Sequence, residues 1–180
     1  MAKERRCVYD YCRQGQFLFR IGHVHILEAD HPMMDHSHGT MTEFTYLEKG
    51  SQTYSVSGKD YTVNQGEVFV AYPEEVHSTG YSLTEVSSLY YFIIDLSCIS
   101  SMRLFVSDEE ADHIAHYWKH ADQRIFKASC GLSGALKRLL RCLPEEGFYF
   151  HTEIRNALSQ VLIALTTPSD MGNRGCSDAF

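Results

Sequence analysis

Residues 36–50 read HSHGTMTEFTYLEKG, and this stretch is the most informative part of the chain. His36 and His38 lie two positions apart, a spacing that puts both side chains on one face if the segment is a β-strand. Glu43 follows them, and Gly50 closes the stretch. Two imidazoles and a carboxylate at fixed spacing are a far more specific signal than a lone histidine. The stretch is therefore the first candidate for a functional site.

A second stretch, residues 66–78, reads GEVFVAYPEEVHS and supplies Pro73 and His77. Around both stretches, short runs rich in β-branched and aromatic residues alternate with Gly, Asn or Asp, which is typical of a β-sandwich or barrel. The sequence Gly-Lys-Asp at 58–60 favours a hairpin turn. The expected strands are residues 17–28, 43–49, 52–57, 61–64, 67–72 and 88–96.

The second half of the chain changes to a helical period. Ser107 and Glu110 form a capping box, which predicts a helix that runs to about His120. Leucines on one face predict a second helix over residues 134–143, and a proline follows it. The spacing of apolar residues from Thr152 onward predicts a third helix, which is again closed by a proline.

We therefore expect a mainly β protein with a helical C-terminal part. At 180 residues the chain is long enough for one domain with a substantial core. The expected segments are an N-terminal arm (1–16), a β-barrel (17–100), a helical segment (101–168) and a frayed tail (169–180).

Composition excludes several classes of protein. The formal net charge is −7, and acidic side chains outnumber basic ones in both halves, so neither half has the charge of a DNA-binding module. The start of the chain lacks the apolar stretch of a secretory signal, and no run approaches the roughly 18 apolar residues of a membrane helix. The six cysteines form no CxxC pair. We interpret them as reduced thiols, which favours a cytoplasmic location.

The two stretches together resemble the signature motifs of the cupin superfamily, HxH-x(3–4)-E-x(6)-G followed by G…P…H. The first motif matches at every position from His36 to Gly50. In the second motif, Glu74 and Glu75 stand where a glycine usually follows the proline. The resemblance covers roughly residues 15–95 and implies a double-stranded β-helix, or jelly-roll, barrel.

By this resemblance, the ligand set for a bound metal is His36, His38, Glu43 and His77. Three imidazoles and a carboxylate form a borderline-hard donor set that suits Zn, Mn, Fe(II), Ni or Cu. In a small barrel such side chains point into the lumen, where one small ligand can also sit. Three interpretations stay open: a functional divalent metal, a polar pocket that requires no metal, and histidines with a purely structural role.

The sequence between the two motifs narrows the resemblance. Residues 56–68, VSGKDYTVNQGEV, closely match the pattern V-x-G-x-x-Y…G-D/E of the sensor domains of AraC-type transcriptional regulators. In that family the barrel binds an effector, and the following helices carry the dimer interface and lead to a DNA-binding half with two helix-turn-helix motifs. The chain ends at Phe180, where that half would begin. We therefore expect contact with DNA only through a C-terminal domain that this sequence does not contain.

The resemblance implies that the chain senses a small molecule, such as a sugar or a related metabolite. Polar groups would fix the effector and aromatic walls would exclude water. Binding would order the N-terminal arm or shift the helices, and would so change the geometry of a homodimer. The residues expected to bind the effector are His36, His38, Glu43, Tyr46, Phe69 and His77.

Two apolar stripes on the expected helices are the predicted dimer interface. The alternative is that both stripes pack inside one chain, but two stripes are difficult to cover on the outside of one barrel, which favours a homodimer. The stripes consist of Leu136, Leu139, Leu140, Leu143, Ile154, Leu158, Val161, Leu162 and Leu165.

The competing function is that of a metal-dependent cupin enzyme. A His3Glu centre with Fe, Mn or Ni can carry out dioxygenase or isomerase chemistry. The missing glycine of the second motif and the leucine-striped helices, which have no obvious catalytic purpose, favour a sensor that is not an enzyme. A stand-alone module that binds carbohydrate or metal is a third interpretation.

Two further groups of histidines carry less information. His23 and His25 repeat the HxH spacing, but no carboxylate follows at the family spacing, and alternation on a half-exposed strand explains them. His113, His116 and His120 share one face of the first expected helix, where a solvated surface is the simpler explanation.

Overall fold

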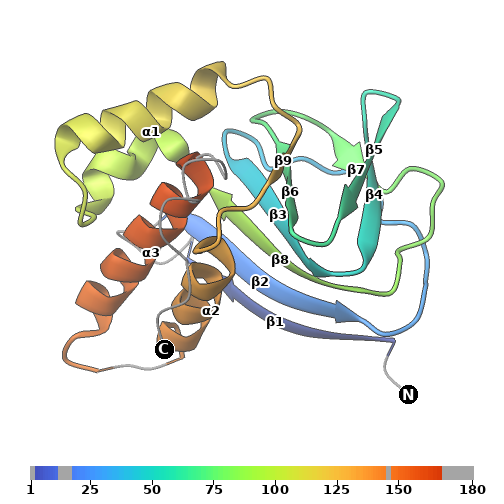
Figure 1. The fold of residues 1–180 in the computed structure, drawn as a ribbon, viewed down its shortest axis with the longest axis horizontal. Helices are drawn as coiled ribbons and strands as arrows, with labels where there is room; N and C mark the ends of the chain where they lie inside the picture. Colours follow the sequence, from blue (N-terminus) through green and yellow to red (C-terminus); the bar gives the residue numbers. More distant parts are fainter. Residues whose placement is uncertain (1–2, 12–17, 145–146, 168–180) are drawn as a thin grey trace, which may run out of the picture. The chain divides into compact units, whose positions relative to one another are not determined.

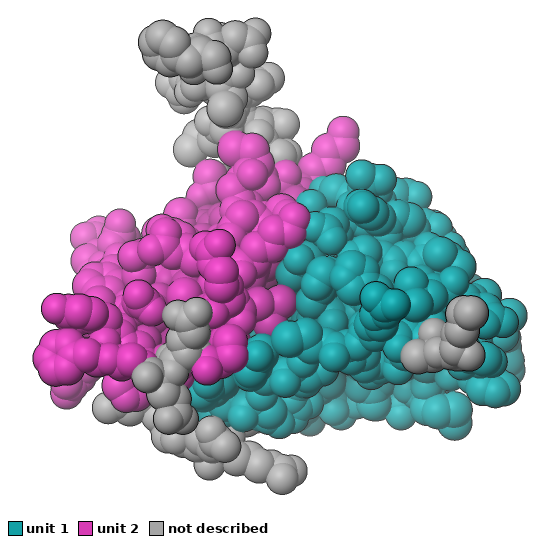
Figure 2. All heavy atoms as spheres, turned by 90° about the horizontal axis from the view of Figure 1, so that it is seen from below, with its two compact units in different colours: residues 1–98, 122–126 teal, residues 99–121, 127–180 magenta. Residues whose placement is uncertain are grey.

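The computed structural model describes residues 3–11, 18–144 and 147–167, so the expected frayed tail, 169–180, lies outside the described residues. The chain divides into two compact units, which Figure 2 shows in teal and magenta. The first unit contains residues 1–98 and 122–126, and the second contains residues 99–121 and 127–180. The short segment 122–126 therefore belongs to the first unit although it lies between two parts of the second.

The first unit is a barrel of two sheets, in which the pairings among β1 to β8 are antiparallel (Figure 1). One sheet has six strands in the order β1-β2-β8-β3-β6-β9, and the other has three in the order β5-β4-β7. The strands are β1 (Glu4–Asp10), β2 (Phe19–Ile26), β3 (Thr42–Lys49), β4 (Ser51–Val56), β5 (Lys59–Asn64), β6 (Glu67–Ala71), β7 (His77–Ser78), β8 (Ser87–Ile94) and β9 (Ile125–Lys127). The expectation of a mainly β barrel followed by helices is confirmed.

The segment expected to be an N-terminal arm contains a strand. β1 pairs with β2 along its whole length, from Glu4 opposite Ile26 to Asp10 opposite Arg20. Little in the sequence indicates this strand, because the first five residues of β1 are exposed and show no apolar face. β7 and β9 were also not expected, since strands of two and three residues have no measurable periodicity.

Alternation along the strands of the larger sheet separates the inside of the barrel from the outside. On β3, Glu43 and Thr45 line the barrel cavity, whereas Phe44 and Tyr46 point to the opposite face. The apolar side chains of the barrel core are buried. Burial of one such side chain contributes about 1.5–3 kcal/mol to the free energy of folding. This core consists of Val24, Ile26, Leu47, Tyr54, Val56, Val63, Phe69, Ala71 and Leu89.

Gly50 makes the tight connection between β3 and β4. Its φ is +78°, and a Cβ at this position would lie 2.6 Å from the carbonyl oxygen of Val86. Both the left-handed backbone and the close approach require glycine. This geometry explains in physical terms why the first motif ends with a glycine.

The second unit holds three α-helices, α1 (Asp108–His120), α2 (Leu132–Cys142) and α3 (Phe150–Thr166), and a 3-10 helix, Leu96–Met102, leads into it. The predicted capping box is present: the Glu110 N–H donates to Ser107 Oγ (3.2 Å), and the Ser107 N–H donates to Glu110 Oε2 (2.7 Å). Trp118 Nε1 donates to Thr166 Oγ1 (3.1 Å), which links α1 to α3. No helix in the described part of the chain is both long and apolar enough to cross a bilayer.

The leucine stripes predicted to form a dimer interface are buried within the single chain. Leu136, Leu139, Leu143, Ile154, Leu158, Val161, Leu162 and Leu165 are each at most 4% exposed, and Leu140 is half-buried. Side chains that are already out of water have almost no area left to bury in a dimer. The alternative of packing inside one chain therefore accounts for these residues, and a homodimer would have to use other side chains.

Candidate metal and effector site

The four motif residues converge on one point of the barrel. One ligand atom from each of His36, His38, Glu43 and His77 lies within 4.8 Å of the others. His77 begins β7 and Glu43 is the second residue of β3. The two remaining histidines come from the loop before β3, rather than from a strand as the HxH spacing suggested.

An isolated β-bridge, rather than a regular strand, holds the first histidine in place. The backbone N–H of His36 donates to the carbonyl of His77 (3.1 Å), and the N–H of His77 donates to the carbonyl of His36 (2.9 Å). This reciprocal pair places the two imidazole rings 4.3 Å apart, centroid to centroid. The second motif is thereby fixed against the first at the residues that carry the chemistry.

Glu43 is the centre of the hydrogen bonds in the cluster. Its Oε2 lies 2.6 Å from Nε2 of His38 and 3.2 Å from Nε2 of His77. Its Oε1 accepts a hydrogen bond from the hydroxyl of Thr45 (2.7 Å). Both carboxylate oxygens are therefore satisfied although the residue is only 8% exposed.

Backbone carbonyls orient two of the imidazoles. Nδ1 of His36 lies 2.9 Å from the carbonyl oxygen of Met34, and Nδ1 of His77 lies 3.3 Å from that of Glu75. A carbonyl can only accept, so we assign the ring proton to Nδ1 in both neutral histidines. In such a neutral ring Nε2 offers a lone pair that a metal ion can bind. In His77 without a metal, Nε2 instead lies 3.2 Å from Oε2 of Glu43 and donates to that carboxylate when the ring is protonated.

Burial and hydrogen bonding have opposite effects on the pKa values of the cluster residues. Burial alone would raise the pKa of Glu43, but the hydrogen bonds from His38 and His77 outweigh it and hold that pKa well below the usual range. Burial lowers the pKa of His36. For His77 the attraction of Glu43 outweighs burial and raises the pKa. The carboxylate is therefore ionised, as a metal ligand must be.

The donor set fits a divalent metal ion. Two donors on one ion lie about 3 to 4 Å apart when each metal–ligand distance is about 2.0–2.2 Å. The four donor atoms are already within 4.8 Å of one another, and backbone carbonyls hold two of the imidazoles through Nδ1, which leaves Nε2 on the opposite side of each ring. Zn, Ni, Mn or Fe(II) would suit three imidazoles and a carboxylate. Among the described residues, no second group of three or more His, Cys, Asp or Glu converges in this way.

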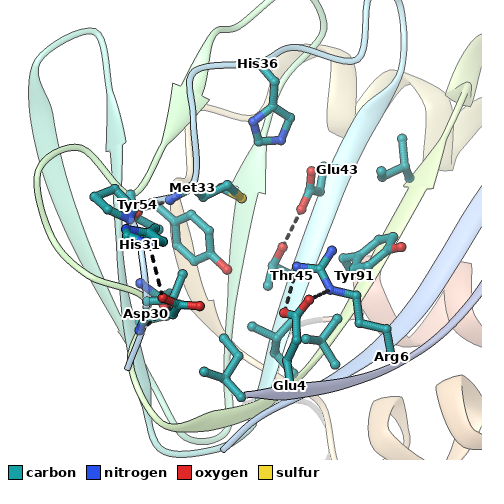
Figure 3. A pocket seen from close by; sticks show the side chains of 18 of the residues that line it. Glu4, Arg6, Asp30, His31, Met33, His36, Glu43, Thr45, Tyr54 and Tyr91 are labelled. Carbon is teal, nitrogen blue, oxygen red and sulfur yellow. Dashed lines mark hydrogen bonds and ion pairs between the residues drawn. The ribbon is translucent and has the colours of Figure 1, made fainter. Parts of the chain in front are cut away.

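A cavity of about 410 Å³ adjoins the cluster (Figure 3). His36, His38 and Glu43 line it, whereas His77 is 1% exposed and is not among the lining residues. Two aromatic residues that were expected to bind the effector, Tyr46 and Phe69, are not among the residues that line this cavity. Tyr46 is three positions after Glu43 and therefore faces the other side of the sheet, and Phe69 is packed in the core, where it stacks on Tyr54 at 4.5 Å.

Several residues that line the cavity were missed by sequence reasoning. Thr45 and Tyr91 are directly opposite each other on β3 and β8, and both face the cavity. For Thr45 a signal existed, because it is two positions after Glu43 on the same strand. Arg6 could not be found, because it lies on β1, which was not expected, and Arg20 lies on the expected strand β2 but outside both motifs. The other polar or aromatic lining residues include Asp30, His31, Gln52, Tyr54, Thr79 and Thr84.

The other histidine groups do not form comparable sites. On the opposite face of the sheet, His23 Nε2 lies 3.0 Å from Ser88 Oγ and its ring stacks on Tyr90 at 4.0 Å. His116 and His120 lie on α1 with their rings 4.4 Å apart. The main site is thus the cluster inside the barrel.

Solved structures with a related fold share little sequence with this chain, and no curated protein sequence matches it. KdgF from Halomonas sp. is 15% identical with a TM-score of 0.41, over 52% of this chain and 79% of that chain. A cupin protein from Bacteroides fragilis is 13% identical with a TM-score of 0.41, over 52% and 79%. The bacterial pirin YhhW from Escherichia coli, in complex with nickel(II), is 21% identical with a TM-score of 0.42, over 52% and 45%.

The family assignment rests instead on the sequence itself. The family described as the AraC-like ligand binding domain matches residues 22–177, which includes most of the barrel and all three helices. The match contains both cupin motifs and the polar cluster that they build. The chain therefore belongs to the family of AraC-like ligand binding domains.

Proposed function

We propose that this chain is the effector-sensing domain of an AraC-type transcriptional regulator and that its effector binds in the barrel cavity. The observation that carries the proposal is the position of the cluster: His36, His38 and Glu43 meet at the wall of a cavity of about 410 Å³. A cavity of this size with apolar walls and a few convergent polar groups suits a small molecule. Membership of a ligand-binding family supports the same conclusion.

The site works as a binding site with or without a metal. Without one, the imidazoles and the carboxylate are hydrogen-bonding groups for the effector. With Zn, Ni, Mn or Fe held by the four motif residues, the metal would supply a Lewis-acidic position for an oxygen atom of the effector. In both cases Met34 and Glu75 keep the rings in place through their backbone carbonyls.

The proposal also covers the assembly of the regulator. We infer a homodimer in the cytoplasm, and contact with DNA through a domain outside this chain. Because the leucine stripes are buried, the dimer would use exposed apolar side chains of the helical unit. Phe148, Tyr149 and Ile163 are 95%, 65% and 47% exposed.

Elemental mass spectrometry and a thermal-shift screen of metabolites test the site. The protein, purified without a tag, is compared with a His36→Ala/His38→Ala variant and with a matched control, His113→Ala/His116→Ala, which removes two imidazoles from α1. We expect at least one metabolite to raise the melting temperature of the wild type and of the control but not of the cluster variant. A screen in which every hit stabilises the cluster variant equally would contradict the proposal.

A cupin enzyme is the second candidate function, and the three-histidine, one-carboxylate donor set favours it. Near-stoichiometric Fe, Mn or Ni that is lost in the cluster variant, together with oxygen uptake or isomerisation of a bound metabolite, would support the enzyme. Reversible binding with no turnover of the bound metabolite would support the sensor.

A further inference from the structure

One end of the cavity carries hydrogen-bond donors that are remote in sequence from the motif residues. Arg6 on β1, Arg20 on β2 and Tyr91 on β8 all line the cavity. In Figure 3 the Arg6 side chain extends from β1 toward Tyr91. Burial raises the pKa of the Tyr91 hydroxyl, and the positive charges of Arg20 and Arg6 partly offset this.

Tyr91 is fixed in this position by a glycine on the neighbouring strand. Gly22 is directly opposite Tyr91 in the β2–β8 register. A Cβ on Gly22 would lie 2.4 Å from two atoms of the phenol ring and 2.6 Å from its oxygen. The ring therefore occupies the space that a side chain at position 22 would fill. Within the described part of the chain, the Tyr91 hydroxyl makes no hydrogen bond, so it is a donor that still lacks an acceptor.

The two arginines also have donors to spare. Arg6 binds Glu4 through Nε (2.6 Å) and Nη2 (2.8 Å), and Arg20 binds Asp10 through Nη2 (2.9 Å) and Nε (3.1 Å). Among the described residues, no acceptor is bound to Nη1 of either guanidinium. In the Arg6–Glu4 pair the side chains are 57% and 41% exposed. Exposed ion pairs contribute little stability, so a ligand can replace Glu4 at small cost.

The carboxylates around the cavity, in contrast, already have partners. Glu43 is bound by two imidazoles and Thr45, and Asp30 lies 3.0 Å from Nζ of Lys3. Glu4 pairs with Arg6. The lining therefore offers an excess of donors rather than of acceptors, and a ligand that brings its own negative oxygens complements it.

We propose that Arg6, Arg20 and Tyr91 form an oxyanion subsite and that the effector is a small organic acid whose carboxylate binds there. Guanidinium groups match a carboxylate through paired, charge-assisted hydrogen bonds. Val24, Ile26, Leu89 and Ile93 line the same cavity and suit the carbon skeleton. This inference rests on the proposed effector site. It makes an organic acid, rather than a neutral sugar, the expected class of effector.

Comparing each acid with its uncharged amide tests whether binding requires a negative charge on the ligand. Acetate, succinate, adipate and benzoate are each compared with the corresponding amide by thermal shift, and the best binder is titrated by calorimetry. The variants are Arg6→Gln, Arg20→Gln and Tyr91→Phe. The control is Arg5→Gln, because Arg5 is exposed on the same strand and alternation points it to the other face. Circular dichroism checks that each variant is folded.

We expect at least one acid to bind more tightly than its amide, and its affinity to fall about tenfold or more in the Arg6 and Arg20 variants. Tyr91→Phe should weaken binding less, and Arg5→Gln should leave it unchanged. Equal binding of acid and amide, or an equal loss in the Arg5 variant, would overturn the inference.

The same experiment separates this inference from the proposed function. L-Arabinose is added to the panel as a neutral polyol. Binding of arabinose or an amide that is lost in the His36→Ala/His38→Ala variant but kept in Arg6→Gln would overturn the carboxylate subsite and leave the proposed effector site intact. If no acid, amide or sugar binds, both the subsite and the proposed effector site are contradicted.

Discussion

Arg124 forms a bidentate ion pair with Glu75, with Nη2 at 2.7 Å from Oε1 and Nη1 at 2.5 Å from Oε2. Arg124 also donates to the carbonyl of Val70 (2.7 Å). The carbonyl of Glu75 in turn accepts from Nδ1 of His77. The ion pair therefore joins the segment 122–126, which lies in sequence between α1 and α2, to the turn that orients a residue of the cluster.

Removing this arginine should weaken both the barrel and the cluster. The two side chains are only 17% and 28% exposed, so Arg124→Ala leaves a poorly solvated carboxylate without its partner. We expect the free energy of unfolding in urea to fall by about 2 kcal/mol, and the affinity for Zn(II) or Ni(II) to fall about tenfold. Arg138→Ala, an exposed change on α2, should alter neither quantity. Equal effects of the two substitutions would contradict this role of Arg124.

The cluster should give the metal-free protein a bell-shaped dependence of stability on pH. The pKa of Glu43 is held low, so its contribution is present above the unfolded value of about 4.5 and declines as the pH falls. The pKa of His77 is raised, so its contribution is present below the unfolded value of about 6.5 and declines as the pH rises through the folded value. Both contributions coexist between these two pH values.

The Glu43→Gln substitution removes the carboxylate charge on which both pH-dependent contributions to stability depend. In the presence of a chelator, we expect the variant to be less stable than the wild type by about 2 kcal/mol between pH 4.5 and 6.5. The difference should narrow on both sides of this window. Urea unfolding across the pH range measures it, and a difference that does not change with pH would contradict the assigned hydrogen bonds.

Glu74 occupies a backbone conformation that favours glycine. Its φ is 63°, and its N–H donates to the carbonyl of Gly39 (2.7 Å), which joins the loops of the two motifs. In Glu74→Gly, the relief of about 1–2 kcal/mol of strain is offset by the chain entropy of glycine, so we expect a change within about 1 kcal/mol. Glu74→Val should cost more than about 1 kcal/mol, because a β-branched residue is poorly tolerated at positive φ. Thermal unfolding measures the stability of both variants, and an equal loss in Glu74→Gly and Glu74→Val would refute this account of the Glu74 backbone.

Gly22 and Tyr91 should behave as a coupled pair. Gly22→Ala forces the phenol ring out of its place, and we expect a loss of about 1–3 kcal/mol. In a Tyr91→Ala background the added methyl group meets open space, so the same substitution should cost much less. A double-mutant cycle measures the coupling. Additive effects of the two substitutions would show that the ring does not rest on Gly22.

Ile163 tests the proposed homodimer. It is 47% exposed on α3, next to buried residues of the stripe. We expect Ile163→Glu to convert a dimer to a monomer in light scattering, whereas Gln160→Glu, which makes an equal charge change on the same helix, should not. A wild-type chain that is monomeric at high concentration would contradict the homodimer itself.

The strands with strong alternation were predictable from the sequence, and the weak ones were not. β4 alternates strictly between buried and half-buried residues, and β2 does so except at Ile21 and Gly22, which are both buried, so the positions of both strands followed from the pattern. β1 has no apolar face, and its place in the sheet is set by pairing with β2. Tertiary pairing of this kind leaves no local trace in a single sequence.

The same reasoning applies to the site. The spacing of the motif residues identified the cluster, although the loop, and not a strand, brings His36 and His38 together. Tyr46 is at an odd separation from Glu43 on β3, and alternation along a strand therefore points the two side chains to opposite faces of the sheet. The missing glycine of the second motif was visible in the sequence, but only the left-handed φ of Glu74 shows what that glycine would do.

The segment 122–126 limits how the molecule can be divided. β9 follows β6 at the edge of the six-stranded sheet, and the N–H of Val70 donates to the carbonyl of Arg124 (3.0 Å). A fragment that stops at residue 98 would lose this strand and expose the hydrogen-bonding groups of β6, a template for aggregation. It would also leave Glu75 without its counter-ion. An isolated barrel for crystallography or biosensor design therefore has to carry the sequence through β9, and with it the whole of α1.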